Sequence, residues 1–292
     1  MQVVDLVRRF GDAVAVDAVS FTVAPGRLTG FVGGNGAGKT TTMRMIMGVL
    51  ATHGGHISWQ GRPITAADRR TFGYMPEERG LYPKQPVLDQ LVYIGRLHGM
   101  TAAAARGSAL AHLERFGLAD RAKDVVEKLS LGNQQRVQIV AAVLTGPNAL
   151  ILDEPFSGLD PMAVDSMADL LREHTSRGVP VLFSSHQLDL VERLCDDLVI
   201  LARGRVVASG TTEELRATGQ VRYRLVVDHD AGWTRSIRGV HVCDVDGSTA
   251  VIELRQSGVE RDLLTEALRR GTVHEFCRVV PSISEIFREV SS

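Results

Sequence analysis

The stretch Gly33-Gly34-Asn35-Gly36-Ala37-Gly38-Lys39-Thr40 decides the fold class of this chain. It fits the pattern G-x-x-x-x-G-K-[ST], the loop that holds nucleotide phosphates. A triphosphate has to be wrapped at close range by backbone N–H groups, and glycine turns sharply without a Cβ in the way. Residues 28–32 are typical of a buried strand, and residues 41–47 of a helix whose N-terminus points at the phosphates. The stretch therefore predicts an α/β fold that binds ATP or GTP.

The side chains of this loop supply a cation and a metal ligand. Lys39 is expected to reach the β- and γ-phosphates, and the Thr40 hydroxyl is expected to bind Mg²⁺. The nucleotide-binding residues predicted here are Gly33, Asn35, Gly36, Ala37, Gly38, Lys39, Thr40 and Thr41.

A second part of the site follows an apolar run at residues 149–152. That run predicts a buried strand, and Asp153 at its end would hold the water shell of the magnesium ion beside the loop. Glu154 comes next and is well placed to accept a proton from an attacking water molecule. The pair therefore predicts hydrolysis as well as binding.

The composition is that of an ordinary globular protein of 292 residues, with 44% apolar residues and a net charge of −1. This balance gives no overall basic footprint, so we expect no nucleic-acid partner. No run of about 18 apolar residues occurs, and the N-terminus lacks a basic-then-apolar signal pattern, so we expect neither a membrane span nor secretion. Cys195, Cys243 and Cys277 are far apart and predict idle thiols rather than a disulfide or zinc site.

The chain is expected to hold two domains, residues 1–215 and 220–292. Within the first, residues 3–7 and 14–23 alternate like antiparallel strands, and residues 179–185 are typical of a buried parallel strand. A helical subdomain is expected at about residues 79–145. In the second, strands at 221–227 and 249–254, a helix at 259–270 and a capping box at Ser282 and Glu285 predict a small α+β domain.

Three further segments narrow the class. They are Leu129-Ser130-Leu131-Gly132-Asn133-Gln134-Gln135-Arg136, Phe156-Ser157-Gly158-Leu159-Asp160 and Ser184-Ser185-His186. Together with the phosphate loop they resemble an ATP-binding cassette (ABC) ATPase, the nucleotide-binding subunit of a transporter. More specifically, the chain resembles the bacterial ABC-2-type exporter ATPases, including the group named for sodium efflux, and the resemblance extends into the tail that ends Pro281-Ser282-Ile283-Ser284-Glu285-Ile286-Phe287. It implies the P-loop NTPase fold of ABC ATPases, with an antiparallel β subdomain.

The resemblance implies roles for residues at matching positions. Phe10 would stack on adenine, where the family more often has tyrosine. Ser130 and Gly132 would reach the γ-phosphate of the opposite subunit, and Asp160 would link the two sites. His186 would sense the γ-phosphate.

The sequence departs from the family at two places. Leu131 and Asn133 replace a glycine and a glutamine of the usual Leu-Ser-Gly-Gly-Gln signature, but Ser130 and Gly132 remain. Glu77 stands where the family has a glutamine that senses the metal and the nucleotide. A carboxylate binds magnesium more strongly than an amide and repels phosphate, so we expect Glu77 to keep the sensing role with altered metal dependence.

The resemblance also implies partners. Ser130 lies 91 residues after Lys39 (130 − 39), on a helical arm that would carry it away from its own loop. Two chains, as a homodimer or a heterodimer with a similar chain, would then enclose ATP head to tail. A separately encoded integral membrane permease would dock near residues 77–90, where Leu81, Tyr82 and Pro83 are candidates, and would hold the chain at the cytoplasmic face of the membrane.

Three alternatives remain open at this stage. A GTPase would need an Asn-Lys-x-Asp element, which the sequence lacks. An ABC ATPase that acts on DNA or ribosomes would carry long coiled coils, two cassettes or cysteine clusters. A module that holds ATP without turnover would not need Lys39, Asp153, Glu154 and His186 together. The sequence therefore favours a transporter subunit, with a soluble ABC ATPase acting on a non-membrane partner as the alternative.

Overall fold

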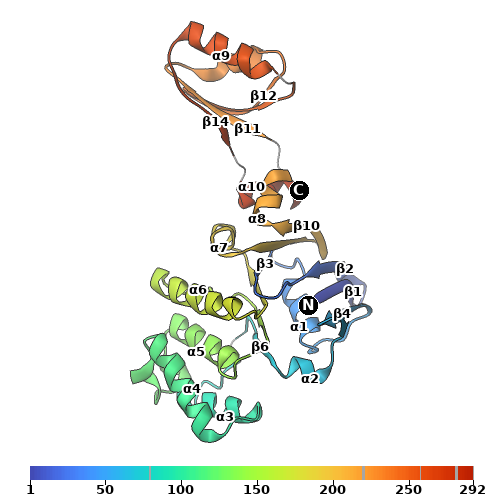
Figure 1. Cartoon of the computed structure of the whole chain (residues 1–292), viewed down its shortest axis with the longest axis vertical. Coiled ribbons are helices and arrows are strands. Elements are labelled where there is room, and N and C mark those ends of the chain that lie inside the picture. The colour runs from blue at the N-terminus through green and yellow to red at the C-terminus, as the bar shows by residue number, and fades with distance from the viewer. Residues whose placement is uncertain (79, 219–220, 257, 280–281, 292) are drawn as a thin grey trace. The chain divides into compact units, whose positions relative to one another are not determined.

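The structure is a computed structural model that describes residues 1–78, 80–218, 221–256, 258–279 and 282–291. These residues divide into two compact units, Met1–Thr212 and Glu213–Val290 (Figure 1). The division expected from sequence lies at residues 215–220, of which 219 and 220 are outside the described residues. Also outside them are residue 79, where the helical subdomain is expected to begin, Pro281 of the tail motif, and residue 292.

The first unit begins with an antiparallel sheet in the strand order β2-β1-β4-β5. Its strands are β1 (Gln2–Phe10), β2 (Ala13–Thr22), β4 (Gly54–Trp59) and β5 (Arg62–Pro63). The alternation of apolar residues in the first two segments puts one face of each strand into the core. Their predicted antiparallel pairing is confirmed.

A second sheet has the strand order β10-β9-β3-β8-β7-β6. Its strands are β3 (Leu28–Gly33), β6 (Phe72–Met75), β7 (Ala149–Leu152), β8 (Val181–Ser185), β9 (Asp197–Ala202) and β10 (Arg205–Thr211). β10 pairs antiparallel with β9 through a tight turn, in which Arg203 and Gly204 have positive φ angles of 50° and 80°. All other neighbouring strands of this sheet are parallel.

The parallel strands decide where the site lies. The carboxyl ends of β3, β6, β7 and β8 meet at one edge of the sheet, because parallel strands share a direction. The phosphate loop follows β3, Glu77 lies two residues after β6, Asp153 and Glu154 follow β7, and His186 follows β8. The fold therefore gathers four segments that are far apart in sequence.

Helices cover this framework and form the helical region. The α-helices of the first unit are α1 (Lys39–Ile46), α2 (Ala66–Arg69), α3 (Val87–Leu97), α4 (Ala102–Arg115), α5 (Leu131–Val143), α6 (Pro161–Ser176) and α7 (Leu188–Leu194). Short 3-10 turns occupy Ala119–Arg121 and Val126–Lys128. The α-helices that lie within the helical subdomain expected at about residues 79–145 are thus α3, α4 and α5.

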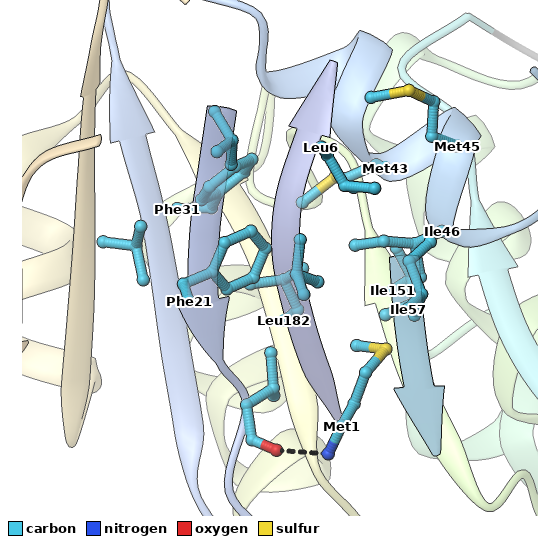
Figure 2. Packing of buried hydrophobic residues seen from close by; sticks show 14 of the residues in the cluster. Met1, Leu6, Phe21, Phe31, Met43, Met45, Ile46, Ile57, Ile151 and Leu182 are labelled. Atoms are coloured by element: carbon cyan, nitrogen blue, oxygen red, sulfur yellow. Dashed lines mark hydrogen bonds between the residues drawn. The ribbon is translucent and has the colours of Figure 1, made fainter. Parts of the chain in front are cut away.

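One hydrophobic core joins the two sheets and α1 (Figure 2). Phe21 of β2 packs against Phe31 of β3 with ring centroids 5.0 Å apart. Met43 and Ile46 of α1 are fully buried in the same cluster, as is Leu182 of β8. The α-amino group of Met1 donates a hydrogen bond of 2.8 Å to the carbonyl of Val23 and ties down the first strand. This packing fixes β3 and α1, which are the two sides of the phosphate loop.

Gly73 marks a close approach between β6 and α5 and carries our first prediction. A Cβ at this position would lie 2.1 Å from the carbonyl oxygen of Ala142, a backbone atom that cannot turn away. Gly73→Ala should therefore lower the free energy of unfolding by about 1–3 kcal/mol or more. Chemical denaturation of the full chain measures this.

Gly107 of α4 provides the matched control, because a Cβ there meets open space. Gly107→Ala should raise the free energy of unfolding by about 0.5–1 kcal/mol. Equal effects of the two substitutions would contradict this account of β6 and α5.

The second unit is an antiparallel sheet in the order β12-β13-β11-β14 with a helix on one face. Its elements are α8 (Thr212–Thr218), β11 (Arg222–Val227), a 3-10 helix at Ala231–Ser236, β12 (Val240–Asp246), β13 (Thr249–Leu254), α9 (Val259–Arg270), β14 (Val273–Val279) and α10 (Ile283–Ser291). Leu263 and Ala267 of α9 are buried against Leu225 and Ile252 of the sheet. The predicted strands β11 and β13 and the helix α9 are confirmed, whereas β12 and β14 were not predicted.

The capping box expected at the start of α10 is present. The Ser282 N–H donates to Glu285 Oε2 over 2.8 Å, and the Glu285 N–H donates to Ser282 Oγ over 3.2 Å. Ile283 and Ile286 of α10 are buried.

Candidate functional site

A cleft of about 740 Å³ opens at the carboxyl edge of the parallel strands. It is lined by Ala15, Asn35, Gly36, Ala37, Gly38, Lys39, Thr40, Thr41, Glu77, Leu131, Gln135, Asp153, Glu154, Ser157, Gly158 and His186. The structure thus brings together the phosphate loop, both acids of the predicted hydrolytic pair, Glu77 and His186. Phe10, Gly33, Ser130, Gly132 and Asp160 do not line this cleft.

The glycines of the loop have conformations that other residues would strain to adopt. Gly36 and Gly38 have φ angles of +76° and +103°. A Cβ at Gly38 would lie 2.6 Å from the carbonyl oxygen of Ala15, and one at Gly33 would lie 2.6 Å from that of Leu201. The loop therefore needs glycine at these positions, as a cradle of backbone N–H groups requires.

Lys39 is a buried cation at the base of this loop. Its Nζ donates hydrogen bonds to the carbonyl oxygens of Gly33 over 2.7 Å and Gly34 over 3.3 Å. The loop thus holds the ammonium group inside the cleft, facing the space that its own glycines enclose. A phosphate there would meet a charge whose position is already fixed.

Asp153 is fully buried at the end of β7. Its Oδ1 accepts a hydrogen bond of 2.5 Å from the Ser184 hydroxyl of β8. Within the part of the chain that the structure describes, its Oδ2 is buried without a hydrogen-bond partner. Burial raises the pKa of Asp153, while the hydroxyls of Ser184 and Thr40 act in the opposite direction. The carboxylate is therefore held in place but incompletely satisfied.

Glu154 and His186 form a contact across the cleft. His186 Nδ1 lies 2.9 Å from Glu154 Oε2, and burial raises the pKa of the Glu154 carboxyl. Glu154 has a positive φ of 52°, which is strained for a residue with a Cβ. Gln135 Nε2 donates to the Glu154 carbonyl over 2.9 Å, and the Glu154 N–H donates to Ser184 Oγ over 2.8 Å. These bonds hold Glu154 in a strained backbone conformation, with its carboxylate against His186.

The residues present fit a magnesium ion. The unpartnered Oδ2 of Asp153 is an orphaned oxygen ligand, and the Thr40 hydroxyl donates to Glu77 Oε2 over 3.2 Å in the same cleft. Hydroxyl and carboxylate oxygens are the hard donors that Mg²⁺ prefers, usually with several waters retained. Thr40, Asp153 and Glu77 therefore make a suitable set of ligands.

The buried Asp153 carboxylate gives a prediction about stability. Folding raises its pKa, so the ionised form opposes folding once the pH exceeds the unfolded value near 3.8. At neutral pH, without nucleotide or Mg²⁺, Asp153→Asn should raise the free energy of unfolding by about 1–3 kcal/mol. Thermal denaturation measures this, and Asp169→Asn, on the exposed face of α6, is the control. An Asp153→Asn chain less stable than the native one under these conditions would contradict the prediction.

Ser130 and Gly132 of the signature lie at the start of α5, beside the cleft rather than in it. The Ser130 hydroxyl caps the helix by accepting from the Asn133 N–H over 3.3 Å. Gly132 packs against the Phe156–Asp160 loop, since a Cβ there would lie 2.9 Å from the Gly158 carbonyl oxygen. Leu131, which replaces the usual glycine, is 60% exposed and lines the cleft.

Two other predicted site residues, Asp160 and Phe10, lie outside the cleft. Asp160 caps α6 by accepting from the Ala163 N–H over 2.9 Å, and it pairs with Arg136 of α5 over 2.6 Å. Phe10 is 48% exposed at the end of β1, with the Arg8 guanidinium 4.8 Å from its ring centroid. Its free ring area can take a base, but the structure does not bring it into the cleft.

Sequence reasoning missed two supporting residues. Ser184 bonds both Asp153 and the backbone of Glu154, and Gln135 holds the Glu154 carbonyl from α5. Ser184 could have been found, because its strand ends beside the acidic pair. The contact of Gln135 with the Glu154 carbonyl depends on how α5 packs, and nothing in the sequence around Gln135 indicated it.

No helix in the described ranges is both long and apolar enough to cross a bilayer.

Comparison with known proteins agrees with this geometry. Residues 16–157 match the family model described as ABC transporter, and residues 210–291 match the model described as ATP-binding protein DrrA1-3-like, C-terminal domain. The chain is 40% identical over 283 residues to the uncharacterized ABC transporter ATP-binding protein YhaQ of Bacillus subtilis, covering 97% of this chain and 95% of that protein. It is 38% identical over 211 residues to a Nod factor export ATP-binding protein I of Burkholderia lata, covering 71% and 69% of the two chains.

A solved structure described as the ATP binding subunit of an ABC transporter has the same fold. It superposes with a TM-score of 0.68 at 35% identity over 74% of this chain and 91% of that one. The predicted fold class is thereby confirmed. The chain belongs to the ABC transporter family, as an ATP-binding subunit, and it is an ATPase.

Proposed function

We propose that this chain hydrolyses ATP as the motor subunit of an exporter, driving a membrane permease encoded separately. The observation that carries the proposal is the convergence of Lys39, Asp153, Glu154 and His186 on one cleft. Nucleotide binding alone would need only the phosphate loop. Hydrolysis also needs an oriented carboxylate and an imidazole beside that loop.

The residues of the cleft have different roles in the proposed hydrolysis of ATP. The loop N–H groups and Lys39 bind the β- and γ-phosphates and stabilise charge that develops on the γ-phosphoryl oxygens. A water molecule attacks the γ-phosphorus in line, its proton passes to the Glu154 carboxylate, and the bond to the β-phosphate oxygen breaks to leave ADP and phosphate. His186, 2.9 Å from Glu154, orients that carboxylate. Thr40, Asp153 and Glu77 would hold Mg²⁺, which neutralises phosphate charge.

We further propose that the complete site needs two chains. Ser130 and Gly132 do not line the cleft of their own chain, yet Ser130 stands at the N-terminus of the thirteen-residue helix α5. Such a terminus offers N–H groups and a hydroxyl to an anion. A two-fold arrangement would place this terminus over the partner's phosphate loop and leave no half-site unused. A heterodimer with a similar chain satisfies the same geometry.

Glu77 gives a prediction about metal dependence. Its carboxylate lies beside the Thr40 hydroxyl, so it can bind the metal more strongly than the amide expected there. Glu77→Gln should raise the Mg²⁺ concentration needed for half-maximal hydrolysis by roughly tenfold, equivalent to about 1.4 kcal/mol. Glu78→Gln is the control, because the Glu78 side chain is 86% exposed and pairs with Arg44. An unchanged rate of hydrolysis and an unchanged Mg²⁺ dependence in Glu77→Gln would contradict a role of Glu77 in binding the metal.

The permease would dock on a groove next to Glu77. This groove of about 290 Å³ is lined on its apolar side by Phe72, Pro76, Leu81, Ile94 and Ala142, and polar groups at its border include those of Arg69, His98 and Gln138. Tyr82 beside it is 63% exposed. Apolar side chains on one face of an amphipathic helix of a membrane protein would fit this groove, and a helix seated over it would lie next to the metal-sensing carboxylate. The chain would then work at the cytoplasmic face of the membrane.

Two comparisons support export as the direction of transport. The match to a Nod factor export protein extends over the cassette, and the match to the DrrA1-3-like domain extends over the second unit. Both point to the ABC-2-type exporter group that the motifs resemble.

Affinity purification from membranes tests the transporter assignment. We expect the native chain to bring down a polytopic membrane protein, and Leu81→Asp to lose it while retaining ATP hydrolysis. The Lys128→Asp chain, changed at an exposed position away from the groove, should keep the partner. Recovery of only ribosomal or DNA-associated proteins would favour the alternative of an ABC ATPase with a non-membrane partner.

A further inference from the structure

The second unit carries a group of metal-ligating side chains that the ATPase chemistry does not use. His241 and Cys243 lie on β12, and Glu253 lies on the neighbouring strand β13. One ligand atom from each, an imidazole nitrogen, the thiol sulfur and a carboxylate oxygen, lie within 4.8 Å of one another.

The sheet itself produces the grouping. His241 and Glu253 are direct partners in the antiparallel ladder, so their side chains stand on the same face. The next pair, Val242 with Ile252, points to the opposite face, where Ile252 is fully buried in the core of this unit. A shift of register between Val242 and Asp244 places Cys243 in a bulge, and bulges re-aim side chains. Three ligands thus gather on the face that α9 does not cover.

The ligand types and their spacing fit a borderline transition metal. Bonds of about 2.0–2.3 Å from zinc to nitrogen, oxygen and sulfur place tetrahedral ligand atoms roughly 3.6 Å apart. Closing from 4.8 Å needs only small rotations of side chains, and His241 and Cys243 are exposed and have room to rotate. A nitrogen, a sulfur and an oxygen donor together suit Zn²⁺ or Co²⁺ and are a poor set for Mg²⁺.

The neighbouring charge sets a limit on affinity. Arg222 of β11 donates from Nε to Glu253 Oε1 over 3.1 Å, so a metal ion would share this carboxylate with a guanidinium. Partial burial and the Glu253 carboxylate raise the pKa of the Cys243 thiol, with Arg222 acting in the opposite direction. Metal binding must displace the thiol proton and compete with Arg222 for Glu253, and only three protein ligands are offered, so we expect weaker binding than at a four-ligand structural zinc centre.

We propose that His241, Cys243 and Glu253 bind one divalent ion of the zinc class on the exposed face of the second unit, with a fourth position open to solvent. Three protein ligands and an open position are the arrangement that accepts an exchangeable ligand. The ion would link the edge strand β12 to β13, so the stability of this unit would depend on the concentration of the metal ion.

Cobalt titration of the full chain, with any affinity tag removed, tests the proposal. In reducing buffer without nucleotide, we expect saturable binding of one Co²⁺ with a near-ultraviolet band from thiolate-to-cobalt charge transfer, and displacement of that band by Zn²⁺. Cys243→Ser should abolish the band, and His241→Ala should weaken binding by at least the roughly 10–100-fold typical of lost metal-site partners. The band separates this site from the oxygen ligands of the ATP cleft.

Cys277→Ser is the matched control, because Cys277 is also an exposed cysteine of this sheet but donates to Glu275 on its own strand. It should leave the band and the affinity unchanged. Circular dichroism confirms that each variant is folded. A folded native chain without the band, or a folded Cys243→Ser chain with an equal band, would overturn the proposal.

Discussion

Replacing Glu154 with glutamine should lower the rate of ATP hydrolysis by about 10²–10³ while ATP binding is retained. The amide keeps the shape of the side chain but cannot accept the proton of the attacking water. Its position depends on backbone bonds to Ser184 and Gln135 that the substitution does not touch. Steady-state release of phosphate and equilibrium binding of a fluorescent ATP analogue measure the two effects separately.

The control for this variant is Glu127→Gln. Glu127 is an exposed acid in the 3-10 turn before α5, away from the cleft. Its replacement should leave the rate within the error of the native value. A Glu154→Gln chain that hydrolyses ATP at the native rate would remove Glu154 from the proposed reaction.

Replacing Lys39 with alanine should weaken ATP binding as well as slow turnover. The ammonium is held inside the loop by two backbone carbonyls, and a phosphate there gains a charge-assisted interaction of about 1.5–3 kcal/mol. Its loss should weaken ATP affinity by roughly 10- to 150-fold, with a further loss in the rate because the same charge stabilises the transition state. Isothermal titration calorimetry with ATP measures the first loss.

Lys123→Ala is the matched control, since Lys123 is exposed in the helical region outside the cleft. Thermal denaturation of both chains shows whether the loop still folds without the buried cation. Native ATP affinity in a folded Lys39→Ala chain would contradict the assignment of Lys39 to the phosphates.

Much of the first unit could be predicted, because the strand ends indicated by local sequence patterns are the strand ends of the sheet. The apolar run before Asp153 and the glycine loop before α1 each fixed the end of a strand, and parallel strands bring such ends together. The convergence of Lys39, Glu154 and His186 was therefore predictable, although no single segment contains it.

The rest depends on packing that a sequence does not display. β12 was not predicted, because the bulge between Val242 and Asp244 breaks the alternation that marks a strand. The same bulge brings Cys243 beside His241 and Glu253. The wide spacing of the cysteines in the sequence predicted idle thiols, and it gave no sign of this candidate ligand group. The role of Gln135 likewise depends on how α5 lies against the segment after β7.

The mass of the Glu154→Gln chain in solution, with and without ATP and Mg²⁺, tests most directly the claim that two chains enclose the nucleotide. Light scattering after size exclusion should give the monomer mass of 31.7 kDa without nucleotide and twice that value at saturating ATP. The Lys39→Ala/Glu154→Gln chain should remain at the monomer mass throughout. A Glu154→Gln chain that binds ATP and still has a mass of 31.7 kDa would contradict the claim of a homodimer, and the same mass after addition of every co-purified ATPase subunit would contradict pairing altogether.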